Sequence, residues 1–211
     1  GGEEGFRLQI AAHRRGRATI IMVVMLVFYA ALDLGSKEWA LGALSLPSER
    51  AESAVCQPGP GGYIAMQRGI ATPVVLIEGL LELRYAENCG AAFGMLRTAP
   101  SWIRALVFGF AALAACLVLT TMFLRGAGGA LFAASVPLVL SGAIGNLVDR
   151  VRHGYVVDFI LVHLTKTYDW PTFNIADATI FVGVVFLVID GLRNPQGVPG
   201  GSEDQEPADA A

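Results

Sequence analysis

Two aspartates that stand inside or beside apolar segments are the residues of this chain best suited to chemistry. Asp158 lies within the short apolar segment YVVDFILVHL, and Asp177 lies near the start of a longer apolar run that begins at Phe173. A carboxylate at membrane depth costs roughly 2.5–3.5 kcal/mol on insertion scales, so such residues usually mark a site or a pathway. If the two apolar segments are neighbours in space, the two carboxyl groups lie close together.

A close pair of carboxyl groups has a defined chemistry. In a site of low dielectric the two groups cannot both ionise easily, so they share one proton at neutral pH. The ionised member can take a proton from water as general base, while the protonated member can polarise a carbonyl and later protonate a leaving amine. This chemistry suits peptide hydrolysis and uses no covalent intermediate. We therefore expect no metal and no other cofactor.

Polar residues at the ends of the neighbouring apolar runs can support such a pair. The amides of Asn146 and Asn174 can orient the carboxyl groups and hold substrate backbone. Arg150 can pair with Asp149, or it can present its cation to lipid headgroups or substrate carbonyls. Asn174 and Asp177 are three residues apart, so on a helix they face the same way.

Two further polar groups stand earlier in the chain. Asp33 and Lys37 are four residues apart and share a helical face, either as a pair that supports the site or as a snorkelling interfacial ion pair. In the motif NCGAAFG, residues 88–94, Asn88 supplies an amide that donates and accepts, and small residues such as Gly90 permit close backbone approach. A plain turn has the same composition.

Composition places these residues in an integral membrane protein. The chain has 211 residues, a mean hydropathy of +0.55, and only 16% charged residues, against about 25% in average soluble domains. A hydrocarbon core takes about 20 helical residues to cross. Four apolar runs reach that length, so the predicted fold class is membrane α-helical with four transmembrane helices, at about 18–41, 102–124, 129–148 and 173–192. No basic block with interleaved aromatic residues indicates a nucleic-acid partner.

Charge distribution predicts three regions and an orientation. Basic residues before the first apolar run place residues 1–17 in the cytoplasm. The membrane domain covers residues 18–192, and four crossings return the chain to the cytoplasm, where the acidic, Pro- and Gly-rich tail 193–211 is expected to be disordered. The polar residues named above then all lie at the external, periplasmic face.

The external segments predict strands. ATPVVLIE and LLELRYAE have β-branched and alternating character, which favours a hairpin within a small β-cradle at about 71–94. The Ser-, Pro- and Gly-rich stretch 43–69 is typical of a loop. Tyr155–Leu164 is too short to span the membrane, so it predicts a strand or an interfacial helix with Asp158 facing the protein. Gly142 and Gly145 allow close helix packing.

Cysteines and histidines leave two questions open. Cys56 and Cys89 both fall in the external segment and can form a disulfide in an oxidising compartment, although spacing alone does not establish a pairing. Cys116 falls within an apolar run. His153 and His163 flank the first aspartate and raise a metal hypothesis, but HExxH-type spacing is absent from the sequence and solvated interfacial histidines are the simpler interpretation.

Five ordered motifs resemble those of the lipoprotein signal peptidases, the type II signal peptidases. They are GNLVDR (145–150), VVDF (156–159), FNIAD (173–177), NCGAAFG (88–94) and the Asp33/Lys37 pair, and the resemblance covers about residues 18–192. It implies a four-helix aspartyl protease of the bacterial inner membrane, and we expect the chain to act as a monomer. Such an enzyme removes the signal peptide from diacylglyceryl-modified prolipoproteins, just before the lipid-bearing cysteine.

The same resemblance assigns residues. It implies Asp158 and Asp177 as the catalytic pair, and a second group that lines or supports the site: Asp33, Lys37, Asn88, Gly90, Asn146, Arg150, Asn174 and Ala176. It implies a lipidated prolipoprotein and membrane lipid as partners. The chain departs from the family pattern in a longer stretch 43–69, in Cys89 where Thr or Pro is more usual, and in its acidic tail.

Two alternatives remain open at this level. Intramembrane Asp and Asn residues also bind ions, so a proton- or ion-coupled transporter subunit is one rival function. The polar residues gather at one face instead of forming a path across the membrane, which favours an enzyme. A catalytically inactive paralogue is the other alternative.

Overall fold

The computed structural model describes residues 2–47, 55–57, 64–90 and 99–194. Three regions considered above fall wholly or partly outside it. They are much of the stretch 43–69, the end of the motif NCGAAFG, and the acidic tail.

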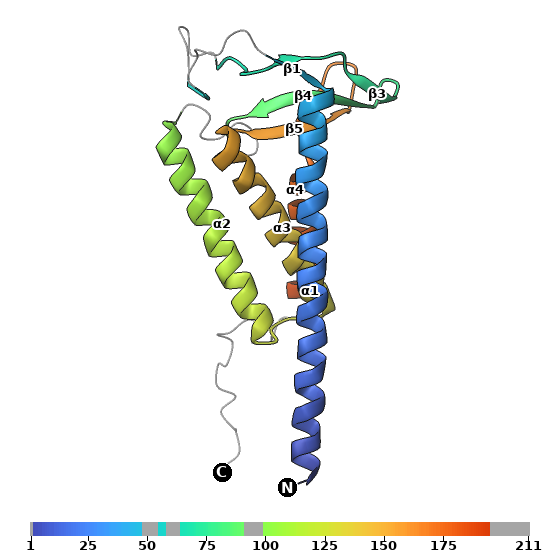
Figure 1. Ribbon diagram of the computed structural model, residues 1–211. Coiled ribbons are helices and arrows are strands. Elements are labelled where there is room, and N and C mark those ends of the chain that lie inside the picture. The colour runs from blue at the N-terminus through green and yellow to red at the C-terminus, as the bar shows by residue number, and fades with distance from the viewer. Residues whose placement is uncertain (1, 48–54, 58–63, 91–98, 195–211) are drawn as a thin grey trace, which may run out of the picture.

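Four helices form the body of the described structure (Figure 1). They are α1 (Gly2–Ala43), α2 (Ser101–Leu124), α3 (Ala130–His153) and α4 (Ile175–Arg193). Each contains a stretch long and apolar enough to cross a membrane. The predicted membrane-helical fold class is therefore confirmed.

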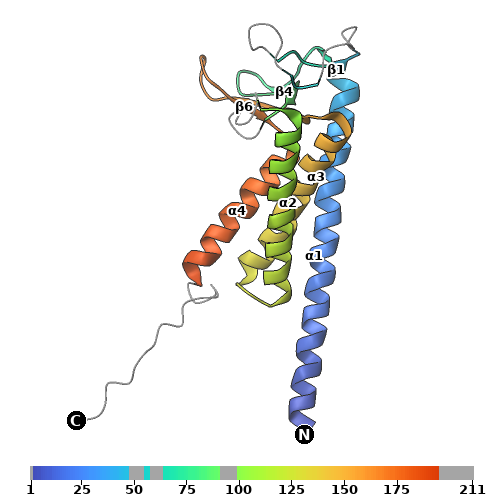
Figure 2. The same cartoon turned by 90° about the vertical axis from the view of Figure 1, so that its left-hand side faces the viewer.

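Helix ends differ from the sequence-based expectation at three places. α1 already begins at Gly2, so residues 2–17 continue the first helix, which extends well past the others at its N-terminal end (Figures 1 and 2). α3 continues to His153 and ends at Gly154, whose φ of 82° is the left-handed conformation that glycine adopts without penalty. α4 begins at Ile175 rather than Phe173, with Asn174 as its N-cap.

α3 is the central helix, in contact with α1, α2 and α4. Two glycines make this packing possible. A Cβ at Gly142 would collide with the carbonyl oxygen of Ala176 in α4, and a Cβ at Gly145 would collide with the carboxylate of Asp33 in α1. The predicted close approach at these two positions is confirmed.

A four-stranded antiparallel sheet covers one end of the bundle (Figure 1). Its order is β3 (Val74–Ile77), β4 (Leu81–Asn88), β5 (Val156–His163) and β6 (Asp169–Phe173). The predicted hairpin is confirmed as β3 and β4, and the segment 155–164 is a strand. A separate two-stranded pair joins β1 (Ser45–Leu46) to β2 (Gly69–Ile70).

The sheet is wider than the expected cradle at 71–94. β5 and β6 also belong to it, and β6 includes residues that we expected in a loop or at the start of the last helix. Pro171 lies in β6, and proline is tolerated there because β6 is an edge strand, where a backbone N–H is not needed for the ladder.

The two faces of the central strands have different neighbours. Asp158 lies opposite Ala86, whereas Val157 lies opposite Glu87 and points to the other face. On that other face Tyr85, Tyr155, Val157 and Phe159 form a buried apolar cluster with the end of α1 and with Cys56 and Cys89. These two cysteines form a disulfide, as the sequence allowed.

Candidate active site

Asp158 and Asp177 come together through Asn174, a residue that contacts both. The Nδ2 of Asn174 donates to Asp158 Oδ1 at 2.7 Å, and its backbone N–H donates to Asp177 Oδ2 at 3.4 Å. Asp158 is 2% exposed and Asn174 is fully buried. β5 therefore delivers one carboxyl group and α4 the other, to one place at the junction of the sheet and the bundle.

The start of α4 explains why Asn174 and Asp177 lie as they do. Asn174 is the N-cap, and its Oδ1 accepts from the backbone N–H of Asp177 at 2.9 Å, while the Asp177 carboxylate accepts from the backbone N–H of Asn174. This reciprocal capping box satisfies two helix N–H groups and holds Asp177 in the first turn, where the helix dipole favours negative charge. The two side chains thus do not simply share a helix face, as the spacing had predicted.

Asn146 of α3 connects the aspartates to a buried cation. Its Nδ2 donates to Asp177 Oδ1 at 2.8 Å, and its Oδ1 accepts from Lys37 Nζ at 2.9 Å and from Asn174 Nδ2 at 3.3 Å. Because lysine only donates and a carboxylate only accepts, these neighbours fix which way the amide points.

Lys37 is the centre of a buried ion cluster. Its Nζ lies 2.8 Å from Asp33 Oδ2 and 3.3 Å from Asp149 Oδ2. Asp33 also accepts from the backbone N–H of Ala176 at 2.8 Å, and Asp149 accepts from that of Val157 at 3.0 Å. Lys37 and Asp33 are each 1% exposed, so the pair supports the site and the snorkelling interpretation is wrong.

Asp149 also supports the site, although the sequence did not predict this role for it. It is 2% exposed and pairs with Lys37 of α1, rather than with its neighbour Arg150, the first partner considered. A signal for it was present in the sequence, because Asn146 and Asp149 are three residues apart and therefore share the face of α3 that meets α1.

Arg150 holds the edge of the site. Its Nη1 donates to the carbonyl oxygen of Asn146 at 3.1 Å, its Nη2 donates to that of Gly90 at 3.0 Å, and its guanidinium lies 4.1 Å from the centre of the Phe108 ring in α2. The Oδ1 of Asn88 accepts from the backbone N–H of Gly90 at 3.0 Å. The ten predicted site residues thus meet at one junction.

Electrostatics distinguish Asp158 from an ordinary surface acid. Burial raises the pKa of its carboxyl group well above the usual value, and the nearby charge of Asp177 raises it further. Hydrogen bonds from Asn88 and Asn174 and the positive charge of Lys37 act in the opposite direction on this pKa. A raised pKa favours the protonated form of Asp158.

The two histidines have other neighbours. His163 Nδ1 lies 2.7 Å from Asp169 Oδ1, and its Nε2 lies 3.7 Å from Glu82 Oε2. The His153 ring lies 5.7 Å from that of Tyr155. Among the residues that the structure describes, no group of three or more His, Cys, Asp or Glu side chains is arranged to hold a metal ion.

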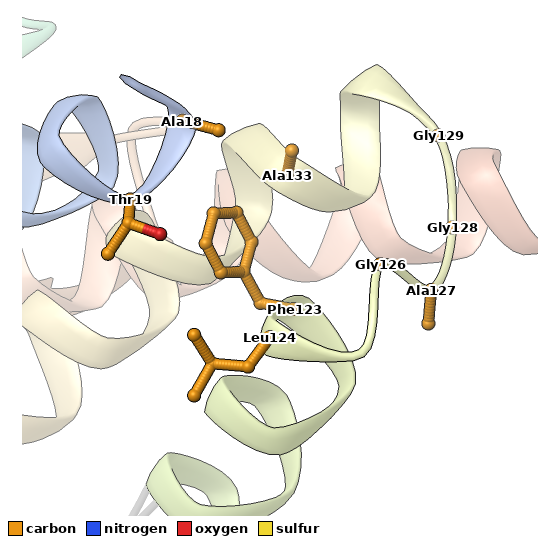
Figure 3. Close-up of a pocket in the computed structure, with 9 residues that line it drawn as sticks. All are labelled: Ala18, Thr19, Phe123, Leu124, Gly126, Ala127, Gly128, Gly129 and Ala133. Carbon is orange, nitrogen blue, oxygen red and sulfur yellow. The ribbon is translucent and has the colours of Figure 1, made fainter. Parts of the chain in front are cut away.

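A separate hollow of about 280 Å³ lies at the opposite end of the bundle (Figure 3). It is bordered by the start of the membrane stretch of α1, the end of α2 and the link to α3: Ala18, Thr19, Phe123, Leu124, Gly126, Ala127, Gly128, Gly129 and Ala133. Its lining is mostly apolar and shares no residue with the junction described above. The junction, not the hollow, is the candidate active site.

Two known structures share the fold of this chain. A bacterial membrane enzyme solved by the in meso method at 2.3 Å resolution superposes with a TM-score of 0.61 and 23% sequence identity, covering 89% of this chain and 94% of that one. A second such structure, at 1.9 Å resolution, has the same TM-score and 24% identity. The fold is thus that of multi-pass bacterial membrane enzymes.

Sequence comparison then identifies the family. The family model for signal peptidase (SPase) II matches residues 23–193, so the chain belongs to the signal peptidase II family of membrane proteases. The lipoprotein signal peptidase of Syntrophus aciditrophicus (strain SB) is 42% identical over 132 residues, which are 62% of this chain and 81% of that protein. That of Burkholderia mallei (strain SAVP1) is 35% identical over 157 residues, 65% of this chain and 93% of the relative.

Proposed function

We propose that this chain is an intramembrane aspartyl endopeptidase that removes signal peptides from diacylglyceryl-modified prolipoproteins and cleaves just before the lipidated cysteine. Membership of the signal peptidase II family and the similarity to lipoprotein signal peptidases support the substrate class. The observation that carries the mechanism is the contact of one buried residue, Asn174, with both carboxyl groups.

The two aspartates have different roles in this proposal. Asp158, whose pKa is raised by burial and by Asp177, holds the proton and donates it to the scissile carbonyl oxygen. Asp177, in the first turn of α4, acts as the general base and takes a proton from the attacking water. The tetrahedral intermediate then collapses as Asp177 passes that proton to the leaving amine, and Asp158 recovers a proton from the new carboxyl group. Protons and bonds balance without a further reactant.

The remaining cluster residues hold the pair in place. The side-chain amides of Asn146 and Asn174 each donate to one of the two carboxyl groups, Asp177 and Asp158 respectively, which orients the pair. Asp33 and Lys37 fix the start of α4 through the backbone of Ala176, and Arg150 fixes the Gly90 carbonyl. Such preorganisation keeps the reacting groups aligned without reorganisation during the reaction.

The proposed orientation places both termini in the cytoplasm and the aspartates near the periplasmic face. Arg14, Arg15 and Arg17 precede the membrane stretch of α1, as expected of a cytoplasmic flank. The Cys56–Cys89 disulfide lies at the end of the bundle that the sheet covers. Disulfides persist in oxidising compartments, which supports a periplasmic position for this end. We further propose that the enzyme acts as a monomer and that its partners are lipids and prolipoproteins, not nucleic acids.

A gel-shift cleavage assay with a diacylglyceryl-modified precursor tests the proposal. The wild-type enzyme should shorten this precursor and leave the same precursor without lipid intact. Asp158→Asn and Asp177→Asn should each abolish cleavage, whereas Asp169→Asn, a matched change at an exposed acid of β6, should not. Near-wild-type cleavage by either dyad variant would contradict the mechanism. Solute flux in liposomes without cleavage would instead support a transporter.

A further inference from the structure

A segment between the first helix and the sheet covers the face of β4 and β5 that points away from the aspartates. Its described parts are Val55–Gln57 and Ile64–Ile70, which we call the covering segment. Cys56 and Ile64 are 2% and 5% exposed and belong to the apolar cluster on that face.

The covering segment is attached to β4 on both sides of Asn88. On one side, the Glu87 carboxylate accepts from the backbone N–H of Gln67 at 2.6 Å and from that of Arg68 at 2.9 Å. On the other side, Cys89 is joined to Cys56 by the disulfide. Asn88 itself points to the opposite face of the strand, toward the aspartates.

The same segment is also fixed to the helices. Arg104 of α2, which is 4% exposed, donates through Nη1 to the carbonyl oxygen of Cys56 at 2.9 Å. Val55 lies against Gly154 at the end of α3, so closely that a Cβ at Gly154 would be 2.9 Å from Val55 Cγ1. The disulfide therefore connects the end of β4 to a point already held by α2 and α3.

Asn88 connects the end of β4, which the covering segment holds, to the site. Asn88 follows Ala86, the residue paired with Asp158, by two positions on the same face of β4, and its side chain lowers the pKa of Asp158. The Oδ1 of Asn88 accepts from the backbone N–H of Gly90, whose carbonyl oxygen accepts from Arg150. A shift of the strand end at Cys89 would therefore move one partner of Asp158 and one partner of Arg150 together.

We propose that the covering segment positions Asn88 on Asp158, with Cys56, Cys89 and Glu87 as positioning residues, so that the enzyme reaches full activity only when the Cys56–Cys89 disulfide is formed. The inference rests on the proposed function of the dyad. It makes the peptidase dependent on the oxidising compartment that it faces, because a newly inserted chain with both thiols reduced holds Asn88 less well.

The pH dependence of the reaction separates positioning from mere stability. The Asn88 hydrogen bond lowers the pKa of Asp158, so losing that bond raises this pKa further. Removing the bridge leaves the charges that act on Asp158 in place. They are Asp177 from α4, Lys37 from α1 and Arg150 from α3. The alkaline limb of the pH–rate profile, where Asp158 loses its proton, should therefore move to higher pH.

The test uses the full-length enzyme in lipid vesicles, with cleavage of a lipidated precursor measured across pH. The double variant Cys56→Ser/Cys89→Ser should lose about tenfold in kcat/KM and move its alkaline limb upward. Asn88→Ala should move the limb in the same direction with the bridge intact. Combining the three substitutions should add little, since residues that act as one unit are not additive. Cys116→Ser, which changes the free cysteine of α2, should leave both rate and profile unchanged.

Two results would overturn the proposal. One is a double variant with the wild-type profile, and the other is a rate loss that follows the fraction of unfolded protein with no movement of the limb. If the double variant does not fold, Glu87→Gln provides the test, because it weakens the hydrogen bonds from Gln67 and Arg68 that attach the covering segment to β4. A shift of the alkaline limb to higher pH in Glu87→Gln supports the proposal, and an unchanged limb overturns it. Failure of the dyad itself is distinguishable, because Asp158→Asn and Asp177→Asn would then retain activity.

Discussion

Two pairs of carboxyl groups meet at the junction of bundle and sheet, and the protein holds them in different ways. Asp33 and Asp149 lie on either side of Lys37, and each also accepts a backbone N–H from a neighbouring element. Asp158 and Asp177 accept from the amides of Asn174 and Asn146. Within the residues that the structure describes, neither has a cation at ion-pair distance.

The difference separates a pair that shares a buried cation from the proposed catalytic pair, in which Asp158 is buried and Asp177 is half-buried. In the first pair Lys37 lies at ion-pair distance from both carboxyl groups, and backbone N–H groups of Ala176 and Val157 complete their surroundings. In the second pair amides orient the groups without neutralising them, so a proton must supply the compensation. A proton held by one member of such a pair is available for acid–base catalysis.

The largest contrast between the pairs should be in the rate. Replacing Asp158 or Asp177 by Asn should lower kcat/KM by about 10³-fold, within the range of a lost general acid or base, and leave the unfolding temperature close to that of the wild type. Rates measured on lipidated precursor and thermal unfolding in detergent, side by side, check this. A dyad variant that lost stability and kept its rate would reverse the assignment of the two pairs.

Removing the shared cation, Lys37, should instead lower the stability of the folded protein. Lys37→Met leaves Asp33 and Asp149 buried without a counter-charge, which should lower the free energy of unfolding by about 3–5 kcal/mol. Denaturant titration of the purified protein measures it, with Lys166→Met in the β5–β6 turn as the matched control. Wild-type stability of Lys37→Met would show that the cluster carries no structural charge.

Disturbing the packing around the first pair, Asp33 and Asp149, should lower stability by a smaller amount. A Cβ at Gly145 would collide with the Asp33 carboxylate, so Gly145→Ala should push α1 away from α3 and lower stability by about 1–3 kcal/mol. Gly109 in α2 has open space where a Cβ would be placed, and Gly109→Ala is therefore the control. Equal unfolding midpoints for the two variants would contradict the tight contact.

Removing a carboxyl group at the other end of the bundle should have the smallest effect on stability and none on the rate. Asp190 near the end of α4 accepts from the backbone N–H of Gly129 at 2.9 Å, and Gly129 is the N-cap of α3. Asp190→Ala should therefore lower stability by about 0.5–2 kcal/mol, as the loss of a helix cap does, and leave kcat unchanged. A large loss of kcat would show that this end also takes part in the reaction.

Sequence alone predicted that Asp158 and Asp177 come together, for a physical reason. Polar side chains at the ends of apolar runs are costly in a membrane, so their presence at Asn146, Asp158, Asn174 and Asp177 pointed to one place. Helix count followed from run length, and the β3–β4 hairpin followed from alternation. These properties depend on composition and short-range periodicity.

The features that the sequence did not predict all depend on how the helices and strands pack against one another. The pairing of Asp149 with Lys37 requires that α3 and α1 face each other at that level. The cap role of Asn174 depends on where α4 begins, and helix ends are poorly set by apolar runs. β6 was missed because its sequence DWPTF lacks alternation and contains proline. Glu87, an acid with no motif around it, acquires a role only through its contacts with Gln67 and Arg68.

The central claim is that the dyad holds one proton at neutral pH, and infrared spectroscopy tests it directly. The carbonyl stretch of a protonated carboxyl group should appear in the wild-type difference spectrum against Asp158→Asn and persist above the ordinary titration range of an aspartate, because burial and Asp177 raise the pKa of Asp158. Against Asp33→Asn the band should cancel. A wild-type protein with no such band at neutral pH, or a band that Asp158→Asn leaves in place, would contradict the account.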